Sequence, residues 1–397
     1  MTGSWGILAL IFAVQAVANV GPLGLPAIAP LIRDDLALSL TQAGSFLPAY
    51  YVGPILMSFP AGWLADRWGI RRTMVIGQLL LGLGLLAAAM APSFTVLVML
   101  TMLAGVGYGM LNPTSTKAVI AWFPQRQRAT AVGLKQTGFP AGGFLGAALL
   151  PLVGLALGWR IAVGASAAAI LLLGLATLGL YRDPADLEPP SRLRTREMIV
   201  AVLRSPDLWR VSVASLFFAL VQTVWLSFLV LYLHEVLLLP VASAARYLAQ
   251  AQLTGVVGRV TFGLLSDRLF GGRRRIVLCL AGTGAMICSV AIAVIGPDTP
   301  AGVLSLLALA FGFVGIGWNG VQHTLMAELA GPRAAGTAVG LGLAVSSLGV
   351  TVGPPLFGWA VEHIGGYRLP WIGLGASVVL ALTLLAQVRE GRRLADH

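Results

Sequence analysis

The chain has 397 residues, of which 57% are hydrophobic and only 10% are charged. So little charge cannot coat a soluble protein of this length, and no soluble domain remains to use the net charge of +11 for binding nucleic acid. The sequence also lacks a phosphate-binding loop, clustered metal ligands and a nucleophile motif. We therefore predict neither an enzyme nor a cofactor or metal site.

A helix that crosses a lipid bilayer needs about 20 mostly apolar residues, and the sequence predicts twelve such helices. Those of the first half fall at 5–32, 41–64, 72–91, 94–121, 127–156 and 159–181. Those of the second half fall at 207–236, 241–266, 274–296, 300–329, 334–363 and 367–389. The segment 182–206 is polar and rich in arginine, and we predict it to be the one long connector.

Two stretches of the first half recur in the second half. The stretch 62–67 returns as 263–268, 201 residues later, and 129–134 returns as 336–341, 207 residues later. Repeats in the same order indicate two halves with the same topology, related by an axis along the membrane normal. The fold class is predicted as an all-α membrane protein with twelve transmembrane helices in two pseudo-symmetric six-helix bundles. The predicted parts are an N-terminal bundle at 1–181, a cytoplasmic linker at 182–206 and a C-terminal bundle at 207–397.

The arginines indicate how the helices are oriented. Most fall in loops on the side of both termini, as Arg67, Arg71 and Arg72 do, whereas Arg33 and Arg160 fall on the other side. Cytoplasmic loops carry the excess of positive charge in membrane proteins. We therefore expect both termini in the cytoplasm, and a multi-pass monomer in the inner membrane.

The loop after the second predicted helix reads Gly62-x-x-x-Asp66-Arg67-x-Gly69-x-Arg71-Arg72, and it resembles the signature of the major facilitator superfamily. A second copy follows the eighth helix, where that family has one, with one residue more before its arginines. The resemblance covers the whole chain. It implies the major facilitator fold, with a central cavity lined mainly by helices 1, 4, 7 and 10.

The two copies of this motif are expected to act in gating. Gly62 would let two helices approach closely. Asp66 would accept hydrogen bonds from arginines and from a helix N-terminus, in a latch that breaks when the halves rock. The predicted gating residues are Gly62, Asp66, Arg67, Arg71, Gly263, Asp267 and Arg268.

Three cations stand inside predicted helices: Lys117 and Lys135, which are the only lysines, and Arg259. A cation at this depth is costly and is normally kept for a function. Lys135 and Arg259 both lie ~12 Å along their helices from the cytoplasmic end, and the repeat pairs them with the uncharged Gly342 and Ser58. We expect Lys135 and Arg259 to converge on one small anion, whereas Lys117 can reach the membrane interface.

Two segments around these cations resemble known anion carriers. The segment 259–267 is similar to helix 8 of monocarboxylate, oxalate and nitrate carriers, and 133–143 is similar to helix 5 of bacterial cyanate and organic-acid porters. The lysine that monocarboxylate carriers have in helix 1 is absent, and Gln15 and Asn19 stand in that helix instead. The resemblance implies a porter for a small organic or inorganic anion.

Further polar side chains are predicted near the middle of the bilayer, either as ligands or as interhelical hydrogen bonds. The tyrosines could donate to a carboxylate, and the histidine could couple proton movement or remain a neutral structural group. These candidates are Gln15, Asn19, Tyr50, Tyr51, Tyr108, Asn112, Gln222, Asn319 and His323.

Our leading hypothesis is a secondary transporter that moves a small anion, such as a monocarboxylate-like organic acid, by alternating access with proton symport or anion exchange. The alternative is a proton-coupled drug exporter of the same fold, whose glycine-proline signature in helix 5 the stretch Gly-Phe-Pro-Ala-Gly-Gly at 138–143 resembles, with Phe139 before the proline and one spacer residue fewer. No acidic residue falls in the middle of a predicted helix, which disfavours cationic drugs. A sensor or scaffold would need a soluble output domain.

Overall fold

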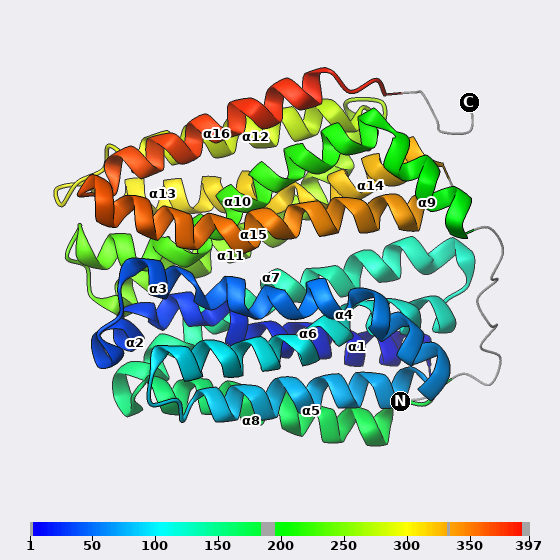
Figure 1. Cartoon of the computed structure of the whole chain (residues 1–397), viewed down its shortest axis with the longest axis horizontal. Coiled ribbons are helices and arrows are strands. Elements are labelled where there is room, and N and C mark those ends of the chain that lie inside the picture. Colours follow the sequence, from blue (N-terminus) through cyan, green and yellow to red (C-terminus); the bar gives the residue numbers. More distant parts are fainter. Residues whose placement is uncertain (1–2, 184–194, 332–333, 391–397) are drawn as a thin grey trace. The chain divides into compact units, whose positions relative to one another are not determined.

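The structure, a computed structural model, describes residues 3–183, 195–331 and 334–390 (Figure 1). These residues form helices joined by short turns, and no strand occurs in the three described ranges. Contacts divide the chain into two compact units. Unit 1 holds Met1–Pro190 with Leu239–Ala249, and unit 2 holds Ser191–Leu238 with Gln250–His397.

The helices of the first half follow each other closely along the chain (Figure 1). They are α1 (Ser4–Gly24), η1 (Leu25–Ile28), α2 (Ala29–Leu36), α3 (Leu40–Gly44), α4 (Phe46–Trp68), α5 (Ile70–Ala88), α6 (Phe94–Trp122), α7 (Gln125–Leu157) and α8 (Trp159–Leu180). Those of the second half are α9 (Thr195–Arg204), α10 (Pro206–Glu235), α11 (Val241–Arg268), α12 (Arg274–Ile292), α13 (Ala301–Phe311), η2 (Gly312–Ile316), α14 (Asn319–Ala330), α15 (Ala335–Ile364) and α16 (Arg368–Ala386).

Most of these helices can span a bilayer. Among the described residues, ten segments are long and apolar enough, with α1 to α2 counted as one segment and α13 to α14 as another. The other two helices of the predicted twelve are α4 and α11, and α11 carries Gln250, Gln252 and Arg259 along its length. Because polar and charged side chains are costly in lipid, these three residues of α11 indicate a function inside the protein.

Each unit repeats the helix pairs of the other. In unit 1, α1 packs against α7 and α5 packs against α8. In unit 2, the corresponding pairs are α10 with α15 and α12 with α16. The two halves that repeat in sequence therefore also repeat in the way their helices pack.

Glycines bring the first of these pairs together. A side-chain carbon placed on Gly142 in α7 would meet the carbonyl oxygen of Ala16, and one placed on Gly349 in α15 would meet that of Leu216. Gly142 and Gly349 stand 207 residues apart, the offset of the repeat. Small residues allow such close backbone approach in membrane helices, so the same contact is built twice.

Three predicted segments differ from the structure. The connector predicted at 182–206 contains the helix α9, and its part 184–194 lies outside the described residues. The first helix is interrupted at η1, where Pro26 lacks the N–H that an α-helix needs. The tenth helix is interrupted at η2, a wider turn with five-residue hydrogen-bond spacing. Apolar runs alone do not reveal such breaks.

Candidate functional site

Lys135 on α7 is completely buried, with 0% of its surface exposed. Its ammonium donates to Oδ1 of Asn112 at 2.7 Å, to the Asn112 carbonyl oxygen at 3.2 Å and to Oγ1 of Thr116 at 2.6 Å. All three bonds to described residues go to neutral oxygens. The bonds offset the cost of burying the ammonium, but they leave its positive charge uncompensated.

The residues that hold this ammonium lie four apart on α6 and therefore share one face of that helix. Asn112 was predicted as a candidate, and the residue is exposed although Lys135 is buried. Thr116 was not predicted, because a threonine at a helix surface carries no signal by itself. The structure thus places Lys135 directly behind an exposed asparagine of α6.

The candidates on α1, α4 and α6 form a second cluster in unit 1. Tyr108 donates its hydroxyl to Oδ1 of Asn19 at 2.8 Å, and Asn19 donates to the Gln15 carbonyl oxygen at 2.7 Å. The rings of Tyr50 and Tyr51 meet the Tyr108 ring edge-on, with centroids 5.9 and 6.4 Å away. The structure therefore brings these five predicted residues together.

Two polar atoms of this tyrosine cluster remain unused. Neither Oε1 of Gln15 nor the hydroxyl of Tyr50 has a hydrogen-bond partner among the described residues, although both atoms are buried. A buried group without a partner normally costs about 1–3 kcal/mol. Such groups are expected where a ligand completes the bonding.

In unit 2, Arg259 on α11 lies beside the break in the tenth helix. Its Nε lies 3.4 Å from the Ile316 carbonyl oxygen, a long hydrogen bond, and Asn319 donates to the same oxygen at 3.3 Å. Ile316 is the last residue of the wide turn η2. Turns of this kind leave backbone groups free of their usual helical partners and occur often at functional sites.

Further predicted residues gather around the same break. Oε1 of Gln222 accepts hydrogen bonds from Nε1 of Trp318 at 2.9 Å and from Nδ2 of Asn319 at 3.2 Å. His323, one helical turn after Asn319, lies near enough to Arg259 to interact with its charge. Trp318 was not predicted, because a tryptophan in a hydrophobic run is normally a packing residue.

The two cation sites occupy matching places in the repeat. Asn112 and Thr116 correspond to Asn319 and His323 at the offset of 207 residues. In each unit this pair of residues lies next to a cation. The cation comes from α7 in unit 1 and from α11 in unit 2. The predicted convergence of Lys135 and Arg259 on one anion stays a prediction.

The third intrahelical cation, Lys117, lies near the end of α6. It is half-buried and interacts electrostatically with Asp183, which follows α8. This position suits a structural cation at a helix end, in keeping with the expectation that Lys117 reaches the interface.

The first copy of the motif contributes less to packing than the sequence suggested. A side-chain carbon on Gly62 would meet no described atom within 4 Å, so the close helix approach expected there stays a prediction. The Arg67 guanidinium lies over the Trp63 ring, 5.4 Å from its centroid. The side chain of Asp66 lies outside the described residues.

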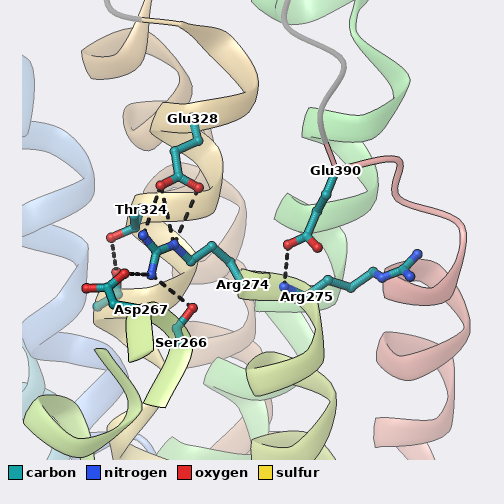
Figure 2. Close-up of polar contacts among 8 residues, drawn as sticks. Ser266, Asp267, Arg274, Arg275, Thr324, Glu328 and Glu390 are labelled. Atoms are coloured by element: carbon teal, nitrogen blue, oxygen red, sulfur yellow. Dashed lines mark hydrogen bonds and ion pairs between the residues drawn. The ribbon is translucent and has the colours of Figure 1, made fainter. Parts of the chain in front are cut away.

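The second copy of the motif is tied into a network of charges, shown in Figure 2. The Arg274 guanidinium forms an ion pair with Asp267, donates to Oγ of Ser266 at 2.9 Å and reaches Oε1 of Glu328 at 3.1 Å. These contacts join α11, α12 and α14 inside unit 2. The ion pair of Asp267 is therefore made within unit 2, and the breakable latch that the sequence suggested at Asp66 stays a prediction.

The remaining gating candidates of this copy are more open. A carbon on Gly263 would meet no described atom within 4 Å, and Arg268 is exposed. Arg274 and Glu328 were not predicted as functional. The signal was available, since both are charged residues that stand close to Asp267 once the helices are paired.

An acidic residue after the last helix of each half caps the third helix of that half. Oδ1 of Asp183 accepts from the backbone N–H of Arg71 at 3.0 Å, at the start of α5. Oε1 of Glu390 accepts from the backbone N–H of Arg275 at 2.6 Å, at the start of α12 (Figure 2). A carboxylate is favourable at a helix N-terminus. For the gating candidate Arg71, the described contact is thus made by its backbone.

No metal site is evident. Within the described ranges, no group of three or more His, Cys, Asp or Glu side chains could hold an ion. The two cysteines, Cys279 and Cys288, are free thiols. The chemistry available is hydrogen bonding and charge, which suits reversible binding.

Apolar spanning helices, two repeated bundles and buried cations define a multi-pass membrane transporter. The family model of the Major Facilitator Superfamily matches residues 7–350, and the chain belongs to that family. The predicted family and the major facilitator fold are confirmed.

Relatives and solved structures agree with this assignment. The chain is 27% identical to a probable sulfoacetate transporter of Cupriavidus necator, over 93% of this chain and 90% of that protein. It is 23% identical to the hexuronate transporter of Bacillus subtilis, over 94% and 92% of the two chains. A crystal structure of a bacterial homolog of the human lysosomal transporter Spinster matches with a TM-score of 0.81, at 18% identity and over 96% of both chains. These relatives are transporters, so the chain is not an enzyme.

Proposed function

We propose that this transporter carries a small organic anion, a monocarboxylate-like acid, and that Lys135 and Arg259 each contribute to its binding site. The observation that carries the proposal is the burial of Lys135, whose hydrogen bonds to described residues all go to neutral oxygens. An ammonium held in this way gains no counter-charge from these described neighbours, and an anionic cargo would supply one.

The second cation suits the same cargo. Arg259 lies beside the wide turn η2, and Asn319, the first residue of α14, donates to the same carbonyl oxygen. A guanidinium offers a planar fork that matches a carboxylate or oxyanion.

Names of relatives support an anionic cargo. Sulfoacetate, hexuronate and L-galactonate transporters are among the similar proteins, and two more are called monocarboxylate transporters. We infer alternating access between the bundles 1–181 and 207–397. Proton symport or exchange against another anion would each overcome the opposing membrane potential, and His323 is our candidate for the proton.

We infer an inner-membrane location with both termini in the cytoplasm, since the arginine-rich loops lie on that side. Labelling of single cysteines placed in the 182–206 segment, in cells with intact membranes, checks this orientation. Labelling there by an impermeant reagent added outside would contradict it.

The test of cargo is uptake into proteoliposomes. Purified protein is screened for thermal stabilisation by small carboxylates and oxyanions, because a ligand that binds only the folded state raises the melting temperature. The best ligand is then used for transport in wild type, Arg259→Gln and Lys135→Met. Normal anion uptake in both variants would reject the proposal, and export of cationic drugs without anion binding would favour the drug-exporter alternative.

A further inference from the structure

Gln252 on α11 is a buried polar side chain with no role in the site described so far. It is completely buried, with 0% of its surface exposed. Neither its Oε1 nor its Nε2 has a hydrogen-bond partner among the described residues. Within the same described ranges, no other buried glutamine leaves both amide atoms unpartnered.

Such a side chain needs a physical explanation. Burial of an amide without hydrogen bonds costs more than any packing of its two methylene groups returns. A leucine would fill the same space at no such cost. The amide is therefore expected to meet polar atoms that arrive from elsewhere, and in a transporter the cargo supplies them.

The position of Gln252 along α11 connects it with the anion site. Arg259 follows seven residues later, which is two turns of the helix, so both side chains start from the same face, ~10 Å apart along the axis. The neighbouring face of α11 is packed, because Gly255 and Gly258 lie against Ile316 and Phe313. Gln252 and Arg259 thus form a polar pair along one side of a packed helix.

The internal repeat gives an independent pointer to the same position. At the offset of 201 residues that relates the two motif copies, Gln252 corresponds to Tyr51. Tyr51 belongs to the tyrosine cluster of unit 1, beside Tyr108. Both bundles therefore place a side chain capable of hydrogen bonding at this level of the corresponding helix.

We propose that Gln252 is a specificity residue that binds a second polar group of the cargo, so that the transported acid is a polar-substituted carboxylate, such as a hydroxy acid, rather than a plain aliphatic one. This inference rests on the proposed function, in which Arg259 binds the acid group. An amide both donates and accepts, which matches a hydroxyl group. A site built to bond a hydroxyl discriminates strongly against an analogue that lacks it.

The test compares two acids with the same carbon skeleton, gluconate and hexanoate, which differ in hydroxyl groups. Affinities are measured by thermal shift on purified full-length protein. The variants are Gln252→Leu, its matched control Gln387→Leu, which changes an exposed glutamine at the C-terminal end of α16, and Arg259→Gln. We expect Gln252→Leu to weaken gluconate binding about tenfold, as the loss of one or two hydrogen bonds does, and to leave hexanoate binding unchanged. The control variant should bind both acids as wild type does.

The outcomes separate this inference from the proposed function. Equal weakening of both acids by Gln252→Leu would make Gln252 a structural residue, and no change for either acid would make it irrelevant. Equal affinity of wild type for both acids would also overturn hydroxyl recognition. In these three cases, Arg259→Gln still abolishes acid binding and the proposed function stands. Binding of neither acid by wild type would overturn the inference of hydroxyl recognition, and failure of every anion in the thermal-shift screen would overturn the proposed function as well.

Discussion

The two bundles of this transporter share a scaffold but differ in the way each holds its cation. In unit 1, Lys135 is completely buried and bonded three times to Asn112 and Thr116. In unit 2, Arg259 is only half-buried and bonds the carbonyl oxygen of Ile316 in the wide turn η2, which Asn319 also bonds. The comparison teaches that the repeat determines which residues lie beside a cation, whereas the helix that carries the cation differs between the two units. Charge can then be asymmetric on a symmetric frame, as a specific cargo requires.

Loss of the more open cation should have the largest effect. We expect Arg259→Gln to reduce anion uptake by on the order of a hundredfold or more, because a charged hydrogen-bond partner of the cargo is removed. Transport into proteoliposomes measures the effect, and Arg246→Gln, on the same helix outside the proposed site, is the control. Arg259→Lys should recover part of the activity. Uptake near wild type in Arg259→Gln would assign the site to unit 1 alone.

Removal of the enclosed cation should separate function from folding. We expect Lys135→Met to reduce uptake by at least about tenfold and to leave the melting temperature equal or higher, since replacing a buried charge by an apolar group is often neutral or stabilising. Uptake and thermal unfolding are measured on the same preparation. A clear fall in melting temperature with normal uptake would make Lys135 a structural residue instead.

The matching glycines should respond alike in the two bundles. Gly142→Ala and Gly349→Ala each place a carbon against a backbone oxygen of the paired helix, and we expect each to cost about 1–3 kcal/mol of stability. Gly62→Ala is the control, with no described atom within 4 Å, and should change stability by less than about 0.5 kcal/mol. Thermal unfolding in detergent measures all three. A large loss for Gly62→Ala would restore the close contact first expected there.

The smallest effect is expected at the two acidic caps. Asp183→Ala and Glu390→Ala each remove an acceptor from a helix N-terminus, and each should cost about 1 kcal/mol of stability without loss of uptake. Asp183→Asn and Glu390→Gln keep an acceptor and should cost less. Altered uptake at unchanged stability would show that the caps take part in gating.

The sequence predicted the fold class, the family and the two cations because these depend on apolar runs, a repeated motif and costly intramembrane charge. It also predicted that Asn112 and Asn319 are polar candidates, and the structure adds that each lies beside a cation. The partners Thr116 and Trp318 could not be predicted, because their residue types are equally common in packing. The repeat offset of 207 residues would have identified Thr116 through His323.

The predicted gating roles stay predictions. Gly62 was expected to allow a close helix approach, and no described atom lies near enough to meet a side-chain carbon there, unlike at Gly142. A latch that breaks during transport was expected at Asp66, whereas the ion pair of Asp267 with Arg274 lies within one bundle. A motif predicts which residue types occur at given positions, but the role of each residue depends on its contacts with neighbouring helices.

The wide turn at Gly312–Ile316 has a consequence for the angular position of everything after it. It holds one residue more than an α-helical turn, so the helix that follows is rotated by about 100° relative to an uninterrupted one. Asn319 and His323, which lie beside Arg259, both follow the turn and carry this rotation. Deleting a single residue such as Val314 would change no polar group and would still swing both side chains away. Selectivity therefore depends partly on the angle at which these side chains leave the helix axis. A residue-by-residue comparison of relatives would miss that angle.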